Sequence, residues 1–293
     1  MGQIVLGLGR WWRAIVALVL GFSVLSVTGL LESQLFYWPI RGEAVTPENA
    51  EDVWFVNPDG QRLHGWWLPA RGVEHPAAAP TIVHVHGNMG HIAFYYLQCS
   101  FLQEAGFNVL LFDYRGFGRS DEKGAPLERA DLLADTQAAI AFARTKTARP
   151  DQPLGVYGLS LGGVIGLAAS ERDPGVDAVV SVAAFSSWEQ IARDRLGWIG
   201  TLLIEPGLDA EESAAGLGDR PLLVIHGEFD RTADPSHAGR IIAAARERGV
   251  KVTSRISPGA FHINPVLSDP ESQRLIVEFF SEHLRTDEPE ADR

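Results

Sequence analysis

Short apolar runs alternate with longer segments of helical periodicity over most of the chain beyond residue 50. The first two runs flank the turn residues Asn-Pro-Asp-Gly at 57–60, which predicts an antiparallel hairpin. Six later runs are apolar on both faces and are followed by amphipathic helices, the pattern of a parallel sheet covered on both sides. The predicted strands of this sheet are 81–86, 108–113, 154–158, 177–184, 221–227 and 251–256, and the predicted helices are at about 91–104, 127–145, 161–172, 235–248 and 270–284. The fold class is therefore α/β, with a mostly parallel eight-stranded sheet.

Residues 188–218 interrupt this alternation, because they contain apolar and helical material without a strand pattern. They lie between two predicted strands, and we expect them to form a small helical cap. The main domain is predicted to span residues 35–285, with the cap at about 188–218. The acidic, proline-containing residues 286–293 are predicted to be a disordered tail.

An uncharged apolar stretch occupies residues 14–31 and follows Arg10 and Arg13. A helix of this length spans ~27 Å, close to the thickness of a bilayer core. Aromatic residues at 11–12 and 36–38 suit the two membrane interfaces. We therefore expect residues 1–34 to be an uncleaved transmembrane anchor. The arginines place a short N-terminus in the cytoplasm and the main domain outside, in the periplasm or the extracellular space. The alternatives are a cleaved signal peptide, which would release a secreted protein, and a buried helix.

Composition narrows the class of protein further. The 293 residues are 46% hydrophobic and carry 25 basic and 37 acidic side chains, a net charge of −12. This apolar fraction predicts a folded core, and the acidic balance argues against nucleic acid as a partner. The single cysteine, Cys99, excludes an internal disulfide and a multi-cysteine metal site. We expect neither a metal nor a cofactor, and the sequence leaves the oligomeric state open.

The strongest chemical signal is the run Gly158-Leu159-Ser160-Leu161-Gly162-Gly163, directly after a predicted strand and directly before a predicted helix. A serine nucleophile on such a sharp turn needs small neighbours, here Gly158 and Gly162. The turn also brings Ser160 to a helix N-terminus, where backbone N–H groups favour developing negative charge. The motif predicts a nucleophilic serine.

The run His86-Gly87-Asn88-Met89 follows the strand 81–86. An enzyme with a serine nucleophile on such a turn binds the oxyanion with two backbone N–H donors. One comes from the residue after the nucleophile, here Leu161, and the other from a loop after an earlier strand. We assign the second donor to the Asn88 N–H, with that of Met89 as the alternative. His86 and Gly87 are expected to hold the turn rather than to react.

A catalytic serine also needs a histidine base and a carboxylate that orients it, in the chain order serine, acid, histidine. Asp230 and His262 each follow a predicted strand, at the same edge of the sheet as Ser160. The spacing leaves room for a helix and a strand between them. Weaker candidates are Glu228 and Asp234 for the acid, and His226, His237 and His283 for the base.

Five motifs in this order, HGNMG, DYRGFGRS, GLSLGG, HGEFD and GAFH, resemble those of the α/β-hydrolase superfamily. More narrowly, the chain is similar to the membrane-anchored bud-emergence-type and serine aminopeptidase-like serine hydrolases, over roughly residues 35–284. The resemblance implies a triad of Ser160, Asp230 and His262 and an oxyanion hole at Asn88 and Leu161. The superfamily includes esterases, lipid hydrolases, thioesterases and peptidases, so the resemblance leaves the substrate open.

The expected activity is cleavage of a carboxylic ester or thioester through an acyl-enzyme, on a small acyl or lipid-like substrate. Met89 and the cap residues Trp198 and Leu202 are expected to contact the acyl chain. The alternatives are an amidase or peptidase, a cofactor-free haloperoxidase, and a non-catalytic binding protein of the same fold. The expected partners are this substrate and the lipid bilayer.

Overall fold

The computed structural model describes residues 11–18, 20–21 and 29–285. In this part of the chain an eight-stranded sheet forms the centre of the molecule. From one edge to the other its strands are β10 (Val252–Ser257), β9 (Leu222–Gly227), β8 (Ala178–Val182), β7 (Leu154–Leu159), β4 (Thr81–Val85), β6 (Asn108–Phe112), β3 (Arg62–Leu68) and β2 (Glu51–Val56).

All neighbouring strands from β10 to β6 run parallel, and only the hairpin β2–β3 is antiparallel to its neighbours. The predicted mostly parallel sheet is confirmed. The chain goes from β4 to β6 on one side and then crosses back to β7 on the other. The carboxyl ends of β4 and β7 therefore lie side by side at a point where the connections diverge, which is where open α/β sheets place their sites.

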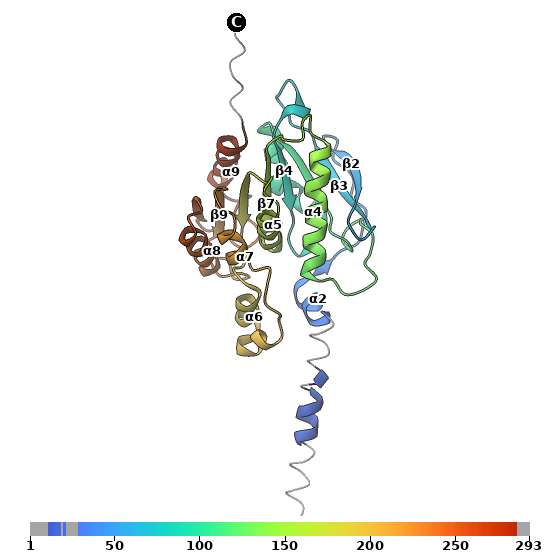
Figure 1. Cartoon of the computed structure of the whole chain (residues 1–293), viewed down its shortest axis with the longest axis vertical. Coiled ribbons are helices and arrows are strands. Elements are labelled where there is room, and N and C mark those ends of the chain that lie inside the picture. Colours follow the sequence, from blue (N-terminus) through green and yellow to red (C-terminus); the bar gives the residue numbers. More distant parts are fainter. Residues whose placement is uncertain (1–10, 19, 22–28, 286–293) are drawn as a thin grey trace, which may run out of the picture.

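Helices cover both faces of the sheet (Figure 1). The apolar sides of α4 (Arg129–Thr145), α5 (Leu161–Arg172) and α8 (Ser236–Glu247) share one core cluster with one face of the sheet. The apolar sides of α3 (Ile92–Glu104) and α9 (Pro270–Leu284) share a second cluster with the other face. The five helices begin and end within about two residues of the predicted ranges.

The cap is smaller than predicted. Helix α6 (Trp188–Leu196) and the 3₁₀ helix η2 (Gly197–Leu202) project from the end of the sheet, whereas α7 (Ala210–Ala215) packs against α5 and α8. Ala210 and Ala214 are fully buried there. The second half of the expected cap, up to residue 218, therefore belongs to the main helical layer.

The segment at the C-terminal end of the predicted anchor is part of the folded domain. Helix α2 (Leu30–Phe36) lies at the same end of the molecule as α6 (Figure 1). The Glu32 carboxylate pairs with Arg129, at the start of α4, at 2.5 Å. Phe36 and Tyr37 are 3% exposed. The prediction that they lie at a membrane interface is wrong for these two residues, because both pack on the domain, and the expected boundary between residues 34 and 35 falls inside α2.

The predicted anchor, residues 14–31, lies partly outside the described residues. Residues 11–18 and 20–21 are helical. Within the described residues we find no helix with the length and apolarity needed to cross a membrane. The tail 286–293 also lies outside them.

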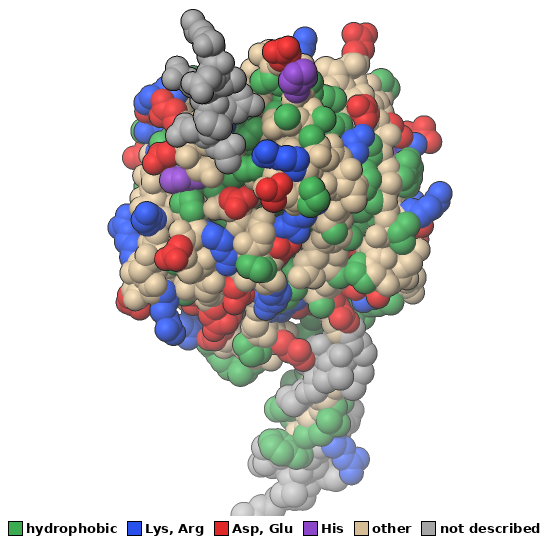
Figure 2. Space-filling view, turned by 45° about the horizontal axis from the view of Figure 1, so that its top comes forward, with side chains coloured by type: hydrophobic (Ala, Val, Ile, Leu, Met, Phe, Trp, Pro, Cys, Tyr) green, Lys and Arg blue, Asp and Glu red, His purple; other side chains and the backbone are tan. Residues whose placement is uncertain are grey.

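On the face shown in Figure 2, acidic and basic side chains are interspersed with apolar ones over the main domain.

Candidate active site

Ser160 lies on the sharp turn between β7 and α5. Its backbone has φ 56° and ψ −119°, a positive-φ conformation that non-glycine residues rarely adopt. A Cβ atom on Gly158 would lie 2.2 Å from the Gly162 carbonyl oxygen, and one on Gly162 would lie 1.9 Å from the Val85 carbonyl oxygen. The turn can therefore form only because both neighbours are glycine, and it holds the Ser160 side chain at the N-terminus of α5.

The structure brings Ser160, His262 and Asp230 together. The Ser160 Oγ lies 2.8 Å from Nε2 of His262, and Nδ1 of the same ring lies 2.7 Å from Oδ2 of Asp230. Asp230 follows β9 and His262 follows β10, so both reach Ser160 from the carboxyl edge of the sheet. In this geometry the imidazole can take the proton of the serine hydroxyl while the carboxylate holds the ring.

Asp230 is 3% exposed and its carboxylate is held by donors on several sides. The backbone N–H groups of Thr232 and Ala233 donate to Oδ1 at 2.8 and 3.0 Å. Burial alone would raise the pKa of Asp230, but hydrogen bonds from His226 and His262 and from the backbone lower it well below its ordinary value. The group is therefore a carboxylate at neutral pH.

His226 is a neighbour of the site whose role the sequence did not predict. It lies inside β9, fully buried, and its Nε2 is 3.1 Å from Asp230 Oδ2 and 2.8 Å from the Ala233 carbonyl oxygen. It thus contacts the same carboxylate oxygen as His262. The signal that could have indicated this contact is its position four residues before Asp230, at the end of the same strand.

The remaining candidate acids and bases contact other parts of the protein. Glu228 accepts from the Gly259 N–H at 2.8 Å, and Asp234 accepts from the Ser236 N–H at 2.9 Å, at the start of α8. His237 bonds Ser186 and Asp194, which ties α8 to the cap, and the His283 ring packs on Phe279. None of these contacts involves Ser160.

The loop after β4 lies against the Ser160 turn, and the cavity at Ser160 is lined by both Asn88 and Leu161. Leu161 is the first residue of α5, so its N–H has no carbonyl to bond within the helix. The His86 Nδ1 lies 2.7 Å from the Gly87 carbonyl oxygen and can donate to it. Burial lowers the pKa of His86 to about 4, so the ring is neutral and holds the turn.

A short strand fixes this loop from outside. In the described chain β1 (Trp38–Pro39) pairs in parallel with β5 (Met89–Gly90), a second small sheet that the sequence pattern did not predict. The Trp38 N–H donates to the Asn88 carbonyl oxygen at 2.8 Å. The Ile40 N–H donates to the Gly90 carbonyl oxygen at 3.3 Å. The segment after α2 therefore positions the loop that carries the expected oxyanion donor.

A cavity of about 320 Å³ opens at Ser160 and His262. Its walls come from α2, β1, the two loops described above, the cap and the loops that follow β8, β9 and β10. The walls are mostly apolar. Among the lining residues in the described part of the chain, Arg195 carries the one fixed charge, and His262 is the other titratable residue. The lining residues are Phe36, Trp38, Asn88, Met89, Ser160, Leu161, Phe185, Ile191, Arg195, Thr232, Ala233, His262 and Ile263.

Two of the expected acyl contacts are not made. Met89 lines the cavity, but Trp198 and Leu202 do not. Both lie on η2 and are 70% exposed. The reason is the orientation of the cap: α6 turns Ile191 toward the cavity, whereas η2 lies farther out. The assignment of Trp198 and Leu202 to the acyl site is therefore corrected.

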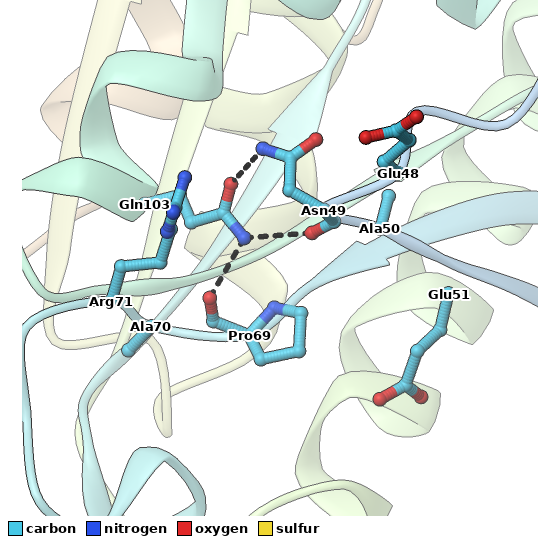
Figure 3. A pocket seen from close by; sticks show the side chains of 8 residues that line it. All are labelled: Glu48, Asn49, Ala50, Glu51, Pro69, Ala70, Arg71 and Gln103. Atoms are coloured by element: carbon cyan, nitrogen blue, oxygen red, sulfur yellow. Dashed lines mark hydrogen bonds between the residues drawn. The ribbon is translucent and has the colours of Figure 1, made fainter.

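A second hollow lies between the start of β2, the end of β3 and α3, away from Ser160 (Figure 3). Its centre is the buried side chain of Gln103, whose Nε2 donates to the carbonyl oxygens of Asn49 and Pro69, both at 2.8 Å. The Asn49 amide donates back to Gln103 Oε1 at 2.5 Å. These polar groups are satisfied by one another, so the network is structural.

The described residues contain no group of three or more histidine, cysteine or acidic side chains placed to hold a metal ion.

The sheet order, the serine turn with positive φ and the hydrogen-bonded chain from Ser160 through His262 to Asp230 are those of an α/β hydrolase. The comparisons agree, and the chain belongs to the α/β-hydrolase superfamily: the family model described as "Serine aminopeptidase, S33" matches residues 76–205. The "Uncharacterized protein YfhR" of Escherichia coli (strain K12) is 35% identical over 237 residues, which cover 79% of this chain and 81% of that protein.

Two further similarities extend over more of the chain. The "Alpha/beta hydrolase domain-containing protein WAV2" of Arabidopsis thaliana is 26% identical over 284 residues, 87% of this chain and 90% of that protein. A solved structure of an esterase of Pyrococcus furiosus superposes with a TM-score of 0.70 at 18% identity, and covers 85% of this chain and 99% of its own. At this identity the likeness to the esterase shows the fold alone.

Proposed function

We propose that the protein is a serine hydrolase that cleaves carboxylic ester or thioester bonds through an acyl-enzyme. The observation that carries the proposal is the hydrogen-bonded chain of three side chains at the cavity. The Ser160 Oγ lies 2.8 Å from His262 Nε2, and His262 Nδ1 lies 2.7 Å from Asp230 Oδ2. These are the distances that proton transfer from a serine hydroxyl requires.

In the proposed reaction His262 takes the Ser160 proton as Oγ attacks the carbonyl carbon. The oxyanion that forms accepts hydrogen bonds from the Leu161 and Asn88 N–H groups, and both of these residues line the cavity at Ser160. The imidazolium then gives its proton to the leaving alcohol or thiol. Water, activated by the same histidine, attacks the acyl-enzyme and releases the acid, which restores the Ser160 hydroxyl.

The walls of the cavity support an acyl substrate. Phe36, Phe185 and Ile191 line it and present apolar surface next to Ser160. Each methylene buried there contributes ~0.8 kcal/mol, so kcat/KM for straight-chain esters should rise several-fold for every two carbons until the cavity is full. A cavity of about 320 Å³ supports a short or medium acyl chain rather than acetate. An acyl-length series of p-nitrophenyl esters measures this directly.

The nucleophile is tested with a fluorophosphonate probe, which labels activated serines. Ser160→Ala should abolish both labelling and esterase activity, and leave the melting temperature nearly unchanged. The matched control is Ser268→Ala, because Ser268 is an exposed serine whose hydroxyl donates to the Asn264 carbonyl oxygen. Wild-type protein that stays unlabelled at neutral pH, or equal labelling of Ser160→Ala, would refute the proposal.

The family description favours a second candidate, an aminopeptidase. Such an enzyme needs a carboxylate to bind the free ammonium group of its substrate. The lining residues in the described part of the chain include no aspartate or glutamate, and the fixed charge is the cation of Arg195. We therefore place ester cleavage first. A comparison of p-nitrophenyl esters with aminoacyl p-nitroanilides distinguishes the two, because an aminopeptidase would prefer the anilides.

We also propose that residues 14–31 anchor the protein in a membrane, with a short cytoplasmic N-terminus and the hydrolase domain outside. The support is the uncharged run itself and the two arginines before it. The anchored protein should remain in the pellet after an alkaline carbonate wash, and protease added from outside should digest the domain. A mature N-terminus beyond Leu31 in mass spectrometry would show a cleaved signal peptide instead.

A further inference from the structure

Arg195 lies in the last turn of α6 and lines the cavity at Ser160. Its guanidinium carbon is 5.2 Å from the centre of the Phe36 ring, and its Nη1 donates to the Leu35 carbonyl oxygen at 3.3 Å. Within the described residues, no carboxylate lies at ion-pair distance from it. A guanidinium has several N–H donors in a planar fork, so most of them remain available.

Two other arginines, Arg129 and Arg115, show what a structural arginine looks like in this protein. Arg129 pairs with Glu32 and donates to the carbonyl oxygens of Glu205 and Gly207. Arg115 is buried and pairs with three aspartates, among them Asp135. Both guanidinium groups are saturated by protein acceptors, and Arg195 is not.

The nearest acid on the same helix is already engaged. Asp194 Oδ2 lies 3.0 Å from His237 Nε2, and Oδ1 accepts from the Gln190 amide at 2.8 Å. The Arg195 side chain is exposed, and partial burial of its guanidinium lowers the pKa of the group from its ordinary value. An arginine nevertheless stays protonated at any physiological pH.

We propose that Arg195 is a specificity residue that binds a negatively charged group of the substrate, a carboxylate or a phosphate, while the apolar walls take the acyl carbons. The inference rests on the proposed hydrolase function and adds the substrate class: an acyl ester or thioester that carries an anion. The planar fork of the guanidinium matches such groups with two hydrogen bonds at once. In a chain of net charge −12, this cation supplies a local attraction for an anion at the cavity.

The test compares esters that differ in charge at one end. On the acyl side the pair is mono-p-nitrophenyl glutarate and p-nitrophenyl valerate, in which a carboxylate replaces a methyl group. On the alcohol side the pair is the butyryl ester of 4-hydroxybenzoate and that of its methyl ester. Each result is the ratio of wild-type to variant kcat/KM, so differences in intrinsic reactivity cancel. The pair that responds identifies the side that carries the anion.

Arg195→Gln should lower kcat/KM for the anionic ester of one pair by roughly 10- to 100-fold, the loss expected for a charge-assisted hydrogen bond. The neutral ester of that pair should change by less than about threefold. Arg195→Lys, which keeps the charge but loses the fork, should recover part of the loss. The matched control is Arg193→Gln, because Arg193 lies on the same helix and does not line the cavity. It should leave both ratios unchanged.

Equal losses on charged and neutral esters would overturn the proposal, because they would mean that Arg195 only holds α2 through Leu35 and Phe36. No loss on either anionic ester would overturn it too. Both outcomes differ from a failure of the proposed function, in which the wild-type protein would hydrolyse none of the esters. Melting temperatures of all variants exclude unfolding as the cause.

Discussion

The pairing of β1 with the loop after β4 makes a prediction about catalysis. The Trp38 N–H donates to the Asn88 carbonyl oxygen at 2.8 Å, and Asn88 is the expected oxyanion donor. Trp38→Pro removes this N–H, whereas Trp38→Ala keeps it, so the difference between the two variants isolates one hydrogen bond. Tyr37, the preceding residue, has φ −125° and ψ 121°, a conformation that a residue before proline readily adopts.

The structure sets the size of the effect. One backbone hydrogen bond contributes ~1 kcal/mol, and complete loss of an oxyanion donor lowers kcat by ~10²- to 10³-fold. Other bonds of the segment remain in Trp38→Pro, among them one from the Ile40 N–H to the Gly90 carbonyl oxygen and one from the Gly118 N–H to the Ile40 carbonyl oxygen. The loop should therefore loosen rather than detach. We expect kcat of Trp38→Pro to be roughly 5- to 30-fold below that of Trp38→Ala, a loss of ~1 to 2 kcal/mol.

The assay is hydrolysis of p-nitrophenyl butyrate, with kcat and KM measured separately, together with the rate of fluorophosphonate labelling. The oxyanion forms in the transition state, so the loss should fall on kcat and on labelling, with KM nearly unchanged. Melting curves of both variants control for stability. Equal kcat values for Trp38→Pro and Trp38→Ala within twofold, in folded proteins, would refute the idea that this segment positions the loop.

Asp230→Asn should lower kcat by ~10⁴-fold, because the amide no longer holds His262 in the reactive tautomer. The hydrolysis of p-nitrophenyl butyrate at pH 8 measures this loss. The pKa of Asp230 is lowered in the folded state, so its contribution to the free energy of unfolding is complete above about pH 4 and is lost as the pH falls through the folded pKa. The free energy of urea unfolding between pH 6 and 3 should therefore fall more steeply for the wild type than for Asp230→Asn, and parallel curves would contradict the lowered pKa. Gly162→Ala should cost more than ~3 kcal/mol of stability, since its Cβ would lie 1.9 Å from a carbonyl oxygen. Its control, Gly239→Ala in α8, meets nothing within 4 Å and should be neutral or stabilising by up to ~1 kcal/mol in thermal melts.

The sequence alone determined most of the layered architecture. The strands are short runs apolar on both faces, and the helices have a 3.6-residue period, so each can be recognised from residues close together in the chain. The motif around Ser160 is also local in sequence, although one contact that requires a glycine, that of Gly162 with Val85, comes from β4. Asp230 and His262 were also predictable, because the carboxyl ends of parallel strands all reach one edge of the sheet.

The surroundings of the site depended on the tertiary structure. β1 is two residues long and has no periodicity, and its partner lies about fifty residues away in sequence, so no local pattern announces it. Phe36 suited a membrane interface by its type and place, and it lines the cavity because α2 folds back on the domain through Glu32 and Arg129.

The cap shows the same division between sequence and tertiary structure. Its apolar residues predicted an element over the site, but only the packing of α6 decided which of them faces inward. Ile191 and Arg195 line the cavity, whereas Trp198 and Leu202 are exposed. The physical reason is that periodicity defines the faces of one helix, while the choice of the face that meets a cavity depends on contacts between layers far apart in the chain.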